Sequence, residues 1–282
     1  MKSIESKLKE YFDAEILSEL KPLETLDEIR IHRGGRIFIR RENENIPVDR
    51  VVSDGMFTDI LDKLCKHSYH TYADMIAKGF IPLGDGFRCG VSGVALCQDN
   101  RIENIYPVND LVIRIPHLIR GVSKEIFNLI ENKRQSILIY SRPCEGKTTL
   151  IRDIAIRLAD YPNYKRVCII DEKNEIIIGD MSRYSLLTAY SLFPKDKAAA
   201  FCIASMSPDY VICDEIVSTD DANSLMLCHG SGVGIIATTH ANSYEGAISR
   251  KQIAELYRNS VFDAYVGIKR RKNGYDFEIT NK

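Results

Sequence analysis

The residues of this chain that are best placed to do chemistry stand at 146–149, where Gly-Lys-Thr-Thr follows a short apolar run and precedes the helix-like segment LIRDIAIRLAD. A strand that leads through a loop into a helix points backbone N–H groups and the positive end of the helix dipole at a bound phosphate. Lys147 is then placed to reach the β- and γ-phosphates of a nucleotide, and Thr148 to hold Mg²⁺. The sequence therefore predicts a nucleotide-phosphate site.

This phosphate loop departs from the regular pattern G-x-x-x-x-G-K-[ST], because Ser141 stands where the first glycine belongs. Glu145 also places a carboxylate among groups that attract an anion, which lowers nucleotide affinity unless the side chain points to solvent. The motif alone therefore does not establish a function. The residues predicted to contact the nucleotide here are Ser141, Cys144, Glu145, Gly146, Lys147, Thr148 and Thr149.

Two acids close an apolar run at 211–216, which reads VICDEI. Phosphoryl transfer requires a carboxylate that holds Mg²⁺ and a group that orients the attacking water, and Asp214 and Glu215 suit these two roles. The alternative is that both carboxylates simply begin a polar loop. The domain-sized separation from Lys147 favours the functional interpretation.

Two more strand-like runs end in polar residues. Asp171 ends the first, and Glu175 follows four residues later, but acids in such places also serve as helix caps or solvated loop residues, so both interpretations stay open. His240 ends the second, next to small donors and acceptors that suit a sensor of the γ-phosphate. A single histidine is more often structural, yet its place at a strand end beside the acids favours a functional role.

These residues need a sheet that brings the strand ends together. Four apolar runs follow the phosphate loop and alternate with helix-length segments, as in repeated βαβ units. This predicts an α/β domain with a mostly parallel sheet, which binds ligands beyond the carboxyl ends of its strands. Asp171, Asp214 and His240 fall at those ends. The four runs are 166–171, 209–215, 233–240 and 262–269.

The preceding part of the chain is predicted to form a smaller α+β domain. Hydrophobic spacing favours helices in some segments and strands in others, and glycines at 90 and 93 indicate a bulged strand. The boundary is expected near residue 125, which gives domains of 1–125 and 126–282. The expected helical segments are 3–20 and the pair within 55–80, and the expected strands are 27–32, 36–41, 87–97 and 111–115.

Composition restricts the partners and the compartment. The 282 residues are 45% hydrophobic and 27% charged with a net charge of -1, which gives no general attraction to nucleic acid or anionic membrane. No apolar run is long enough to cross a bilayer, and the first residues lack a signal peptide's apolar core, so a cytoplasmic location is expected. The eight cysteines occur singly, without CxxC pairs, and are expected to be reduced thiols.

Several of these motifs, taken in order, resemble the stage III sporulation protein AA family of endospore-forming bacteria, which is related to the RecA-like secretion and pilus-motor ATPases. The resemblance covers most of the chain, and a series of spaced motifs is more specific than any one of them. The motifs are LDEIRIHRGG (26–35), SYHTYADMIAKGFIPLGDGFRCGVSG (68–93), LVIRI (111–115), SRPCEGKTTLIRDIA (141–155), IIDEKNEI (169–176), SMSPDYVICDEI (205–216) and ATTHANS (237–243).

The resemblance implies a RecA-like P-loop core and a role for each motif. Lys147 and Thr148 correspond to the end of the Walker A motif, Asp214 and Glu215 to the Walker B pair, and His240 to the histidine box. The acidic box corresponds to Asp171, Glu172 and Glu175, of which Asp171 is expected at the metal and Glu172 at the nucleotide. Glu175 and Glu215 therefore compete for the role of general base.

The resemblance also implies an assembly. Family members are expected to act as hexamers in the mother-cell cytoplasm, using ATP and Mg²⁺ to power or assemble membrane-embedded sporulation channel proteins. In a hexamer, arginines of a neighbouring subunit compensate the charge of the γ-phosphate. The candidates by motif are Arg30, Arg88 and Arg114.

The chain departs from the family pattern in ways that keep alternatives open. Cys144 and Glu145 stand in place of Gly-Cys, and Ala204 replaces an arginine whose loss removes a charge relay near the Walker B pair. These changes suggest a slow ATPase, or a nucleotide-binding assembly module that hardly cleaves ATP. A RecA-like nucleic-acid motor is a third hypothesis, supported only by the shared core and by the basic run 269–272 at an expected hairpin tip.

Overall fold

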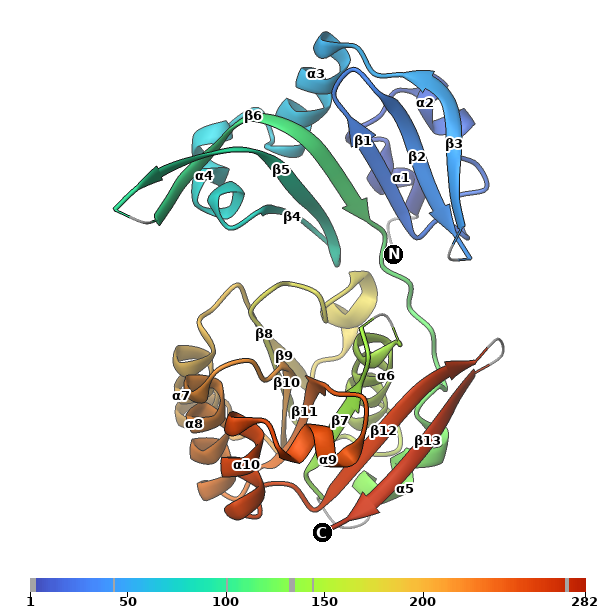
Figure 1. The fold of residues 1–282 in the computed structure, drawn as a ribbon. Coiled ribbons are helices and arrows are strands. Elements are labelled where there is room, and N and C mark those ends of the chain that lie inside the picture. The colour runs from blue at the N-terminus through green and yellow to red at the C-terminus, as the bar shows by residue number, and fades with distance from the viewer. Residues whose placement is uncertain (1–3, 43, 100, 132–134, 144, 272–273) are drawn as a thin grey trace. The chain divides into compact units, whose positions relative to one another are not determined.

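The structure is a computed structural model that describes residues 4–42, 44–99, 101–131, 135–143, 145–271 and 274–282. The chain divides into two compact units, 1–117 and 118–282 (Figure 1). This division falls a little earlier than the predicted boundary near residue 125. Leu118 and Val122 lie before helix α5 (Lys124–Glu131) and pack against the core of the second unit, which explains the difference.

The N-terminal unit is an antiparallel sheet with the strand order β3-β2-β1-β6-β5-β4. Side chains of α1 to α4 pack with the inward-facing strand residues into one hydrophobic core. The predicted helical start is two short helices rather than one, and the predicted helix pair within 55–80 is confirmed. The elements are α1 (Ile4–Leu8), α2 (Ala14–Glu19), β1 (Glu28–His32), β2 (Arg36–Arg41), β3 (Glu44–Val51), α3 (Asp54–Leu64), α4 (Tyr69–Ala77), β4 (Phe80–Gly84), β5 (Phe87–Gln98) and β6 (Arg101–Arg114).

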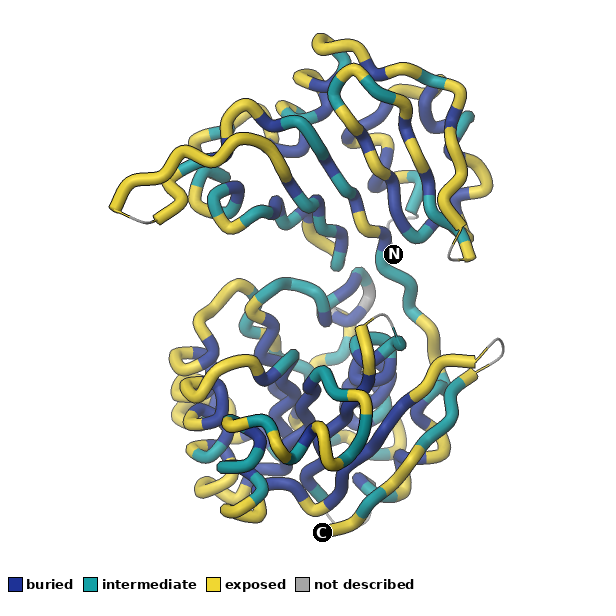
Figure 2. Tube along the Cα trace, viewed as in Figure 1, coloured by how far each residue is buried: buried dark blue, intermediate teal, exposed yellow. Residues whose placement is uncertain are grey.

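The two faces of this sheet differ because strand residues alternate in direction. In β1, Ile29 and Ile31 are buried under the helices, whereas Arg30 and His32 are exposed on the opposite face. Strands β5 and β6 extend beyond their neighbours as a ribbon whose end is exposed (Figure 2). Register shifts near Gly93 confirm the predicted bulge, and its Cβ position is blocked by the carbonyl of Pro107.

The C-terminal unit contains a sheet with the order β13-β12-β7-β11-β10-β8-β9. The pairings are parallel except between β12 and β13, so the predicted mostly parallel sheet is confirmed. The strands are β7 (Ile137–Ser141), β8 (Val167–Asp171), β9 (Leu187–Ser191), β10 (Tyr210–Glu215), β11 (Gly234–His240), β12 (Ala264–Arg271) and β13 (Gly274–Asn281), and the helices after α5 are α6 (Lys147–Ala159), α7 (Lys195–Met206), α8 (Thr219–Gly230), α9 (Tyr244–Ile248) and α10 (Lys251–Arg258).

Helices cover both faces of this second sheet, which is why its central strands are apolar at consecutive positions. In β7, Ile137 and Ile139 pack with α5 and α6, whereas Leu138 and Tyr140 pack with α7, α8 and α10. Figure 2 shows the central strands as a buried layer. In the part of the chain that the structure describes, no helix has the length and apolar character needed to cross a membrane.

Asp153 anchors the segment that enters α5. This carboxylate on α6 is 1% exposed and accepts hydrogen bonds from the N–H groups of Gly121 (2.8 Å) and Ser123 (2.8 Å) and from Ser123 Oγ (2.6 Å). A buried carboxylate with three donors satisfies polar groups that would otherwise be desolvated without partners. The contact therefore joins the start of the C-terminal unit to the helix that follows the phosphate loop.

We expect Asp153→Asn to lower the free energy of unfolding by about 2–4 kcal/mol, because the amide nitrogen cannot accept from these donors and leaves a buried N–H unpaired. Urea unfolding of the full chain measures the effect. Asp196→Asn is the control, since Asp196 is exposed on α7. Equal unfolding free energies for both variants would show that Asp153 does not anchor this segment.

Candidate functional site

The order of the parallel strands decides which side chains meet at the edge of the C-terminal sheet. β11 lies between β7 and β10, and β8 lies on the other side of β10. The register places His240 opposite Ser141 at the ends of β11 and β7. The ends of β10 and β8 carry Glu215 and Asp171. The structure therefore brings the strand-end residues chosen from the sequence to one edge.

The phosphate loop has the predicted form of a strand, a loop and a helix. β7 ends at Ser141, and α6 begins at Lys147 with Gly146 as its N-cap, at φ +95°. A side chain at Gly146 would be strained by this φ, and its Cβ would lie 2.3 Å from Tyr275 Oη. The predicted residue Cys144 lies outside the described residues. Thr148 and Thr149 occupy the first turn of α6, where N–H groups have no partner within the helix.

Lys147 points back over the loop to the end of the neighbouring strand. Its side chain is nearly buried, and Nζ donates to His240 Nδ1 (2.8 Å) and to Ser141 Oγ (3.2 Å). Longer contacts of 3.4 Å reach the carbonyl oxygens of Ser141 and Arg142. These four contacts hold the ammonium group at the carboxyl ends of β7 and β11.

His240 continues this chain to the acid at the end of β10. Because an ammonium group can only donate, Nδ1 of His240 accepts the hydrogen bond from Lys147. Nε2 lies 3.6 Å from Glu215 Oε2. Lys147, His240 and Glu215 therefore form one continuous polar chain across the ends of β7, β11 and β10.

A bulge in β10 separates the directions of its two acids. The pairing with β11 shifts between Cys213 and Glu215, so Glu215 pairs with Thr238 and Asp214 is the extra residue. Bulges of this kind re-aim side chains at functional sites. Asp214 is 7% exposed, whereas Glu215 is half-buried beside His240. The two acids thus occupy different surroundings, as two distinct chemical roles require.

Asp171 holds the backbone of the loop that follows β8. Its Oδ1 accepts from the N–H of Glu175 (2.7 Å), and its Oδ2 accepts from the N–H groups of Ile176 and Ile177 (both 2.9 Å). Burial raises the pKa of the Asp171 carboxyl, and these three donors oppose that shift. The predicted metal role of Asp171 stays untested, and this geometry assigns the carboxylate to holding the loop after β8.

Arg152 on α6 holds the same loop from the opposite side. Its guanidinium donates to the carbonyl oxygens of Ile176 (2.9 Å) and Glu175. Burial lowers the pKa of Arg152 to about 10, while Asp171, Glu175 and Asp214 favour its charged form. Arg152 is therefore a buried cation beside the acids of the site.

Sequence reasoning did not select Arg152, Lys173 or Lys195. Lys173 Nζ lies 3.9 Å from Glu215 Oε2, and Lys195 Nζ lies 3.7 Å from Glu172 Oε2. The signals that the sequence offered were a lysine inside DEKNEI and a Pro-Lys pair at a helix start. Ala204, where an arginine was expected from the family pattern, is exposed on α7.

Glu145 does not compete for the phosphate position in this structure. β12 pairs with β7 as far as Gly267, opposite Tyr140, and then continues to Arg271. The edge of β12 beyond the end of β7 therefore lacks a strand partner, and Glu145 Oε2 accepts from the N–H of Arg270 (2.6 Å). The carboxylate that the sequence marked as repulsive thus joins the phosphate loop to the β12–β13 hairpin. This hairpin confirms the one predicted from 269–279, and its tip residues 272 and 273 lie outside the described residues.

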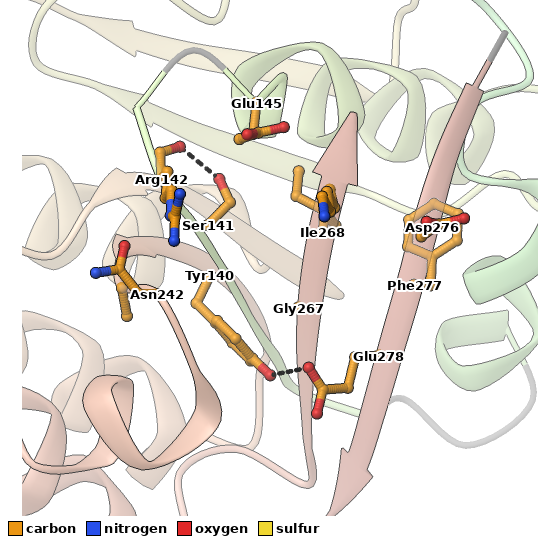
Figure 3. A pocket seen from close by; sticks show the side chains of 12 residues that line it. Tyr140, Ser141, Arg142, Glu145, Asn242, Gly267, Ile268, Asp276, Phe277 and Glu278 are labelled. Atoms are coloured by element: carbon orange, nitrogen blue, oxygen red, sulfur yellow. Dashed lines mark hydrogen bonds between the residues drawn. The ribbon is translucent and has the colours of Figure 1, made fainter. Parts of the chain in front are cut away.

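A pocket of about 340 Å³ opens beside the phosphate loop, between the end of β7, the residues after β11 and the hairpin (Figure 3). Tyr140 Oη lies on its floor and donates to Glu278 Oε2 (3.4 Å). Burial raises the pKa of the Tyr140 phenol to about 12, and Glu278 adds to the shift. Charges of both signs line the pocket: the carboxylates of Glu145, Asp276 and Glu278 and the cations of Arg142 and Lys269.

The three arginines predicted to act in a neighbouring subunit's site lie together on the N-terminal unit. Arg30, Arg88 and Arg114 line a pocket of about 310 Å³ on the sheet face opposite the helices. Cross-strand register explains this, because Arg114 pairs with both Arg88 and Glu28. Gly90, which has no side chain, also lines this pocket. Glu28 lies 2.6 Å from Arg30 and 3.9 Å from Arg114, and Asp110 also lines the pocket, so three arginines face two carboxylates there.

Comparison with known proteins decides the family. The family model for sporulation stage III, protein AA matches residues 6–278. The chain belongs to this family. A curated member, the stage III sporulation protein AA of Bacillus subtilis (strain 168), is 26% identical over 270 residues, covering 91% of this chain and 87% of the relative. The match spans both units, so the resemblance inferred from the motifs is confirmed over nearly the whole chain.

Solved structures show that this sporulation protein AA family member has the fold of secretion and pilus ATPases. The Yersinia pseudotuberculosis ATPase DotB superposes with a TM-score of 0.65 at 14% identity, covering 96% of this chain and 80% of DotB. The ADP-bound pilus retraction motor PilT superposes with a TM-score of 0.63 at 14% identity, covering 95% and 82%. The predicted RecA-like core with an N-terminal α+β domain is thereby confirmed.

The close approach of Tyr275 to Gly146 gives a test of the loop geometry in this family member. We expect Gly146→Ala to cost about 1–3 kcal/mol of unfolding free energy, from the positive φ and from contact with Tyr275. In a Tyr275→Ala background, the unfolding free energy lost through Gly146→Ala should fall to the part caused by the positive φ alone. Gly232→Ala measures that part separately, because Gly232 has φ +75° and no neighbour within 4 Å.

A double-mutant cycle of urea unfolding free energies separates the two contributions. A nonzero coupling between positions 146 and 275 is the expected outcome. If Gly146→Ala costs the same in both backgrounds, and the same as Gly232→Ala, then Tyr275 does not cover the loop.

Proposed function

We propose that this protein binds MgATP at the carboxyl edge of its parallel sheet and hydrolyses it to ADP and phosphate. The observation that carries the proposal is the polar chain from Lys147 through His240 to Glu215. It connects a cation suited to phosphates with a carboxylate suited to activating water. The relatives with the same fold include proteins described as ATPases, which supports the same chemistry here.

The phosphate loop fits a nucleotide phosphate chain. A side chain at Gly146 would fill the start of the cradle, and the N–H groups of the first turn of α6 lie directly after it. Lys147 would exchange its bonds to His240 and Ser141 for bonds to the β- and γ-phosphates. The ammonium is the strongest single attraction for the phosphates that this edge provides.

Thr148 and Asp214 fit a magnesium ion, because a hydroxyl and a carboxylate are the oxygen donors that this ion takes in nucleotide sites. Mg²⁺, when bound, would neutralise charge on the phosphate oxygens. Asp214 suits this role better than Asp171, whose two carboxylate oxygens accept three backbone N–H bonds. Few protein ligands are expected, since Mg²⁺ keeps several waters in such sites.

Glu215 is the preferred general base over Glu175. Its carboxylate lies beside His240 Nε2, on the same polar chain as Lys147. The backbone of Glu175 is instead held in the loop, by Asp171 at its N–H and by Arg152 at its carbonyl. We propose that Glu215 takes the proton of the attacking water, and that Glu175 supports the loop conformation.

His240 is proposed to report whether phosphate is present. With Lys147 bonded to Nδ1, the ring presents Nε2 to Glu215. When Lys147 turns to phosphate, Nδ1 loses this donor, and the ring becomes free to reorient. The state of the phosphate site would thereby reach β10 through one side chain.

The arginine pocket of the N-terminal unit is proposed to meet the phosphates of a neighbouring subunit. Arg30, Arg88 and Arg114 lie on three adjacent strands and form a positively charged surface suited to a polyanion. The proposal requires a closed homo-oligomer, for which we propose a hexamer, and each site would then be complete only with its neighbour's arginines.

In the cell, we propose that ATP turnover drives or assembles a sporulation channel apparatus of membrane-embedded proteins, from the cytoplasmic side in the mother cell. Membership of the sporulation stage III protein AA family supports this setting. The competing hypothesis of an assembly module with little hydrolysis loses part of its support, because Glu145 pairs with Arg270 and not with the phosphate position.

We expect purified wild-type protein to hydrolyse ATP, and we expect Lys147→Ala to weaken binding of a fluorescent ATP analogue at least tenfold. Glu215→Gln should bind the analogue normally but lower kcat by about 10²–10³-fold, because water is no longer activated. Phosphate release and analogue titration measure the two effects. Glu175→Gln is the matched control and should retain most of the turnover.

The outcomes separate the alternatives. Binding without turnover by the wild type would favour the assembly module. Equal turnover in the wild type, Lys147→Ala and Glu215→Gln would refute an ATPase at this site. A larger loss for Glu175→Gln than for Glu215→Gln would exchange the roles of the two acids.

If the arginines act between subunits, two inactive variants should restore activity when mixed. We expect Arg114→Ala and Lys147→Ala each to lack turnover alone, and an equimolar mixture, exchanged before assay, to regain part of the wild-type rate. The rescue arises because some sites combine an intact Lys147 with an intact neighbouring Arg114. Arg36→Ala, on the same sheet but outside the pocket, is the control. No rescue, despite proven subunit exchange, would contradict the trans role.

A further inference from the structure

Lys195 is a buried cation in an unfavourable place. It is the first residue of α7, where the positive end of the helix dipole repels a cation, and its side chain is 6% exposed. Burial of an ammonium group costs free energy unless charged and polar partners surround it. The contacts of Lys195 must therefore offset both costs.

These contacts converge on the segment that follows β10. Lys195 Nζ donates to the carbonyl oxygen of Glu215 (2.5 Å) and to Asp221 Oδ2 (3.1 Å). The same Asp221 oxygen accepts from the N–H groups of Val217 (2.8 Å) and Ser218 (3.0 Å). Lys195 and Asp221 together therefore fix the backbone on the C-terminal side of the bulge in β10.

The direction of the Glu215 side chain depends on this backbone. Glu215 follows the bulge residue. The peptide after it is held at its N–H by the bond from Ile216 to the carbonyl oxygen of Thr238 (2.8 Å), and at its carbonyl by Lys195. Its carboxylate must stay near His240, at 3.6 Å in this structure, to remain on the polar chain from Lys147. A small rotation of the peptide after Glu215 would move the carboxylate away from that position.

We propose that Lys195 is a positioning residue for Glu215, which it orients through the Glu215 carbonyl; this inference rests on the proposed ATPase function. Lys195 also lies 3.7 Å from Glu172 Oε2, at the start of the loop after β8. One ammonium group thus links the loops that follow two strands of the site. Its role is to keep the base aimed, and the ammonium does not touch the reacting atoms.

The test compares Lys195→Met, which keeps the length of the side chain without its charge, with Lys197→Met as the control. Lys197 is exposed on the same helix and pairs with Asp196 at the surface. We expect Lys195→Met to lower kcat about 10- to 100-fold, as for a displaced catalytic group, and to change the dissociation constant of an ATP analogue less than threefold. Lys197→Met should match the wild type in both measurements.

A second measurement does not need turnover. Hydrogen exchange of the amides at 216–218 should become at least about tenfold faster in Lys195→Met and in Asp221→Asn, while protection of the β7 and β11 amides stays unchanged. Adding Lys195→Met to Glu215→Gln should not lower turnover further, because there is no base left to aim.

The outcomes distinguish this inference from the function on which it rests. A wild type without turnover would refute the proposed function, and the exchange experiment would still decide whether Lys195 holds the segment. Equal kcat and equal exchange for Lys195→Met and Lys197→Met would overturn the inference. The inference would also be overturned if Lys195→Met lowered kcat, ATP-analogue affinity and amide protection throughout the C-terminal unit together. Such losses indicate a general structural role. Lys195→Arg, which keeps the charge, should recover part of kcat.

Discussion

The hydrogen bond from Lys147 to His240 depends on one feature of the fold, the position of β11 between β7 and β10. Parallel strands end at a common edge, so this order places the end of β11 between the phosphate loop and the acids of β10. His240 lies between Lys147 and Glu215 and contacts both, with Nδ1 2.8 Å from Lys147 Nζ and Nε2 3.6 Å from Glu215 Oε2.

Apolar runs allowed much of the fold to be predicted, because strands covered by helices on both faces are apolar at nearly every position. This signal is absent where strands lie at an edge or extend into solvent. The sequence pattern did not predict β9 (Leu187–Ser191), which is only partly buried and reads LTAYS. Residues 101–110 of β6 belong to a largely exposed ribbon, so only the end of that strand was predicted. The burial of a strand, and not its intrinsic strand propensity, therefore decided whether it could be predicted from the sequence.

The candidate site was predictable where its residues belong to short motifs at strand ends, as Lys147, Asp214 and His240 do. It was not predictable where a residue acts through contacts between distant segments. Arg152 and Lys195 look like ordinary helix residues until the fold buries them beside the acids. Glu145 differs from these two residues, because its charge in the sequence suggested an effect, the repulsion of phosphate, that its contacts in the fold do not support. The extension of β12 past β7 supplies an N–H donor that no local pattern indicated.

Buried charges of both signs meet at this sheet edge, and their balance constrains how the site can change. Lys147, Arg152 and Lys195 are each less than 10% exposed, as are Asp171, Asp214 and Asp221. Each charge offsets the desolvation of its neighbours, so removing one leaves another without compensation. Fixed charges that are already desolvated need little reorganisation when charge develops during phosphoryl transfer. The cost of burying them is therefore consistent with catalysis, whereas a scaffold that only had to fold would be served better by apolar residues.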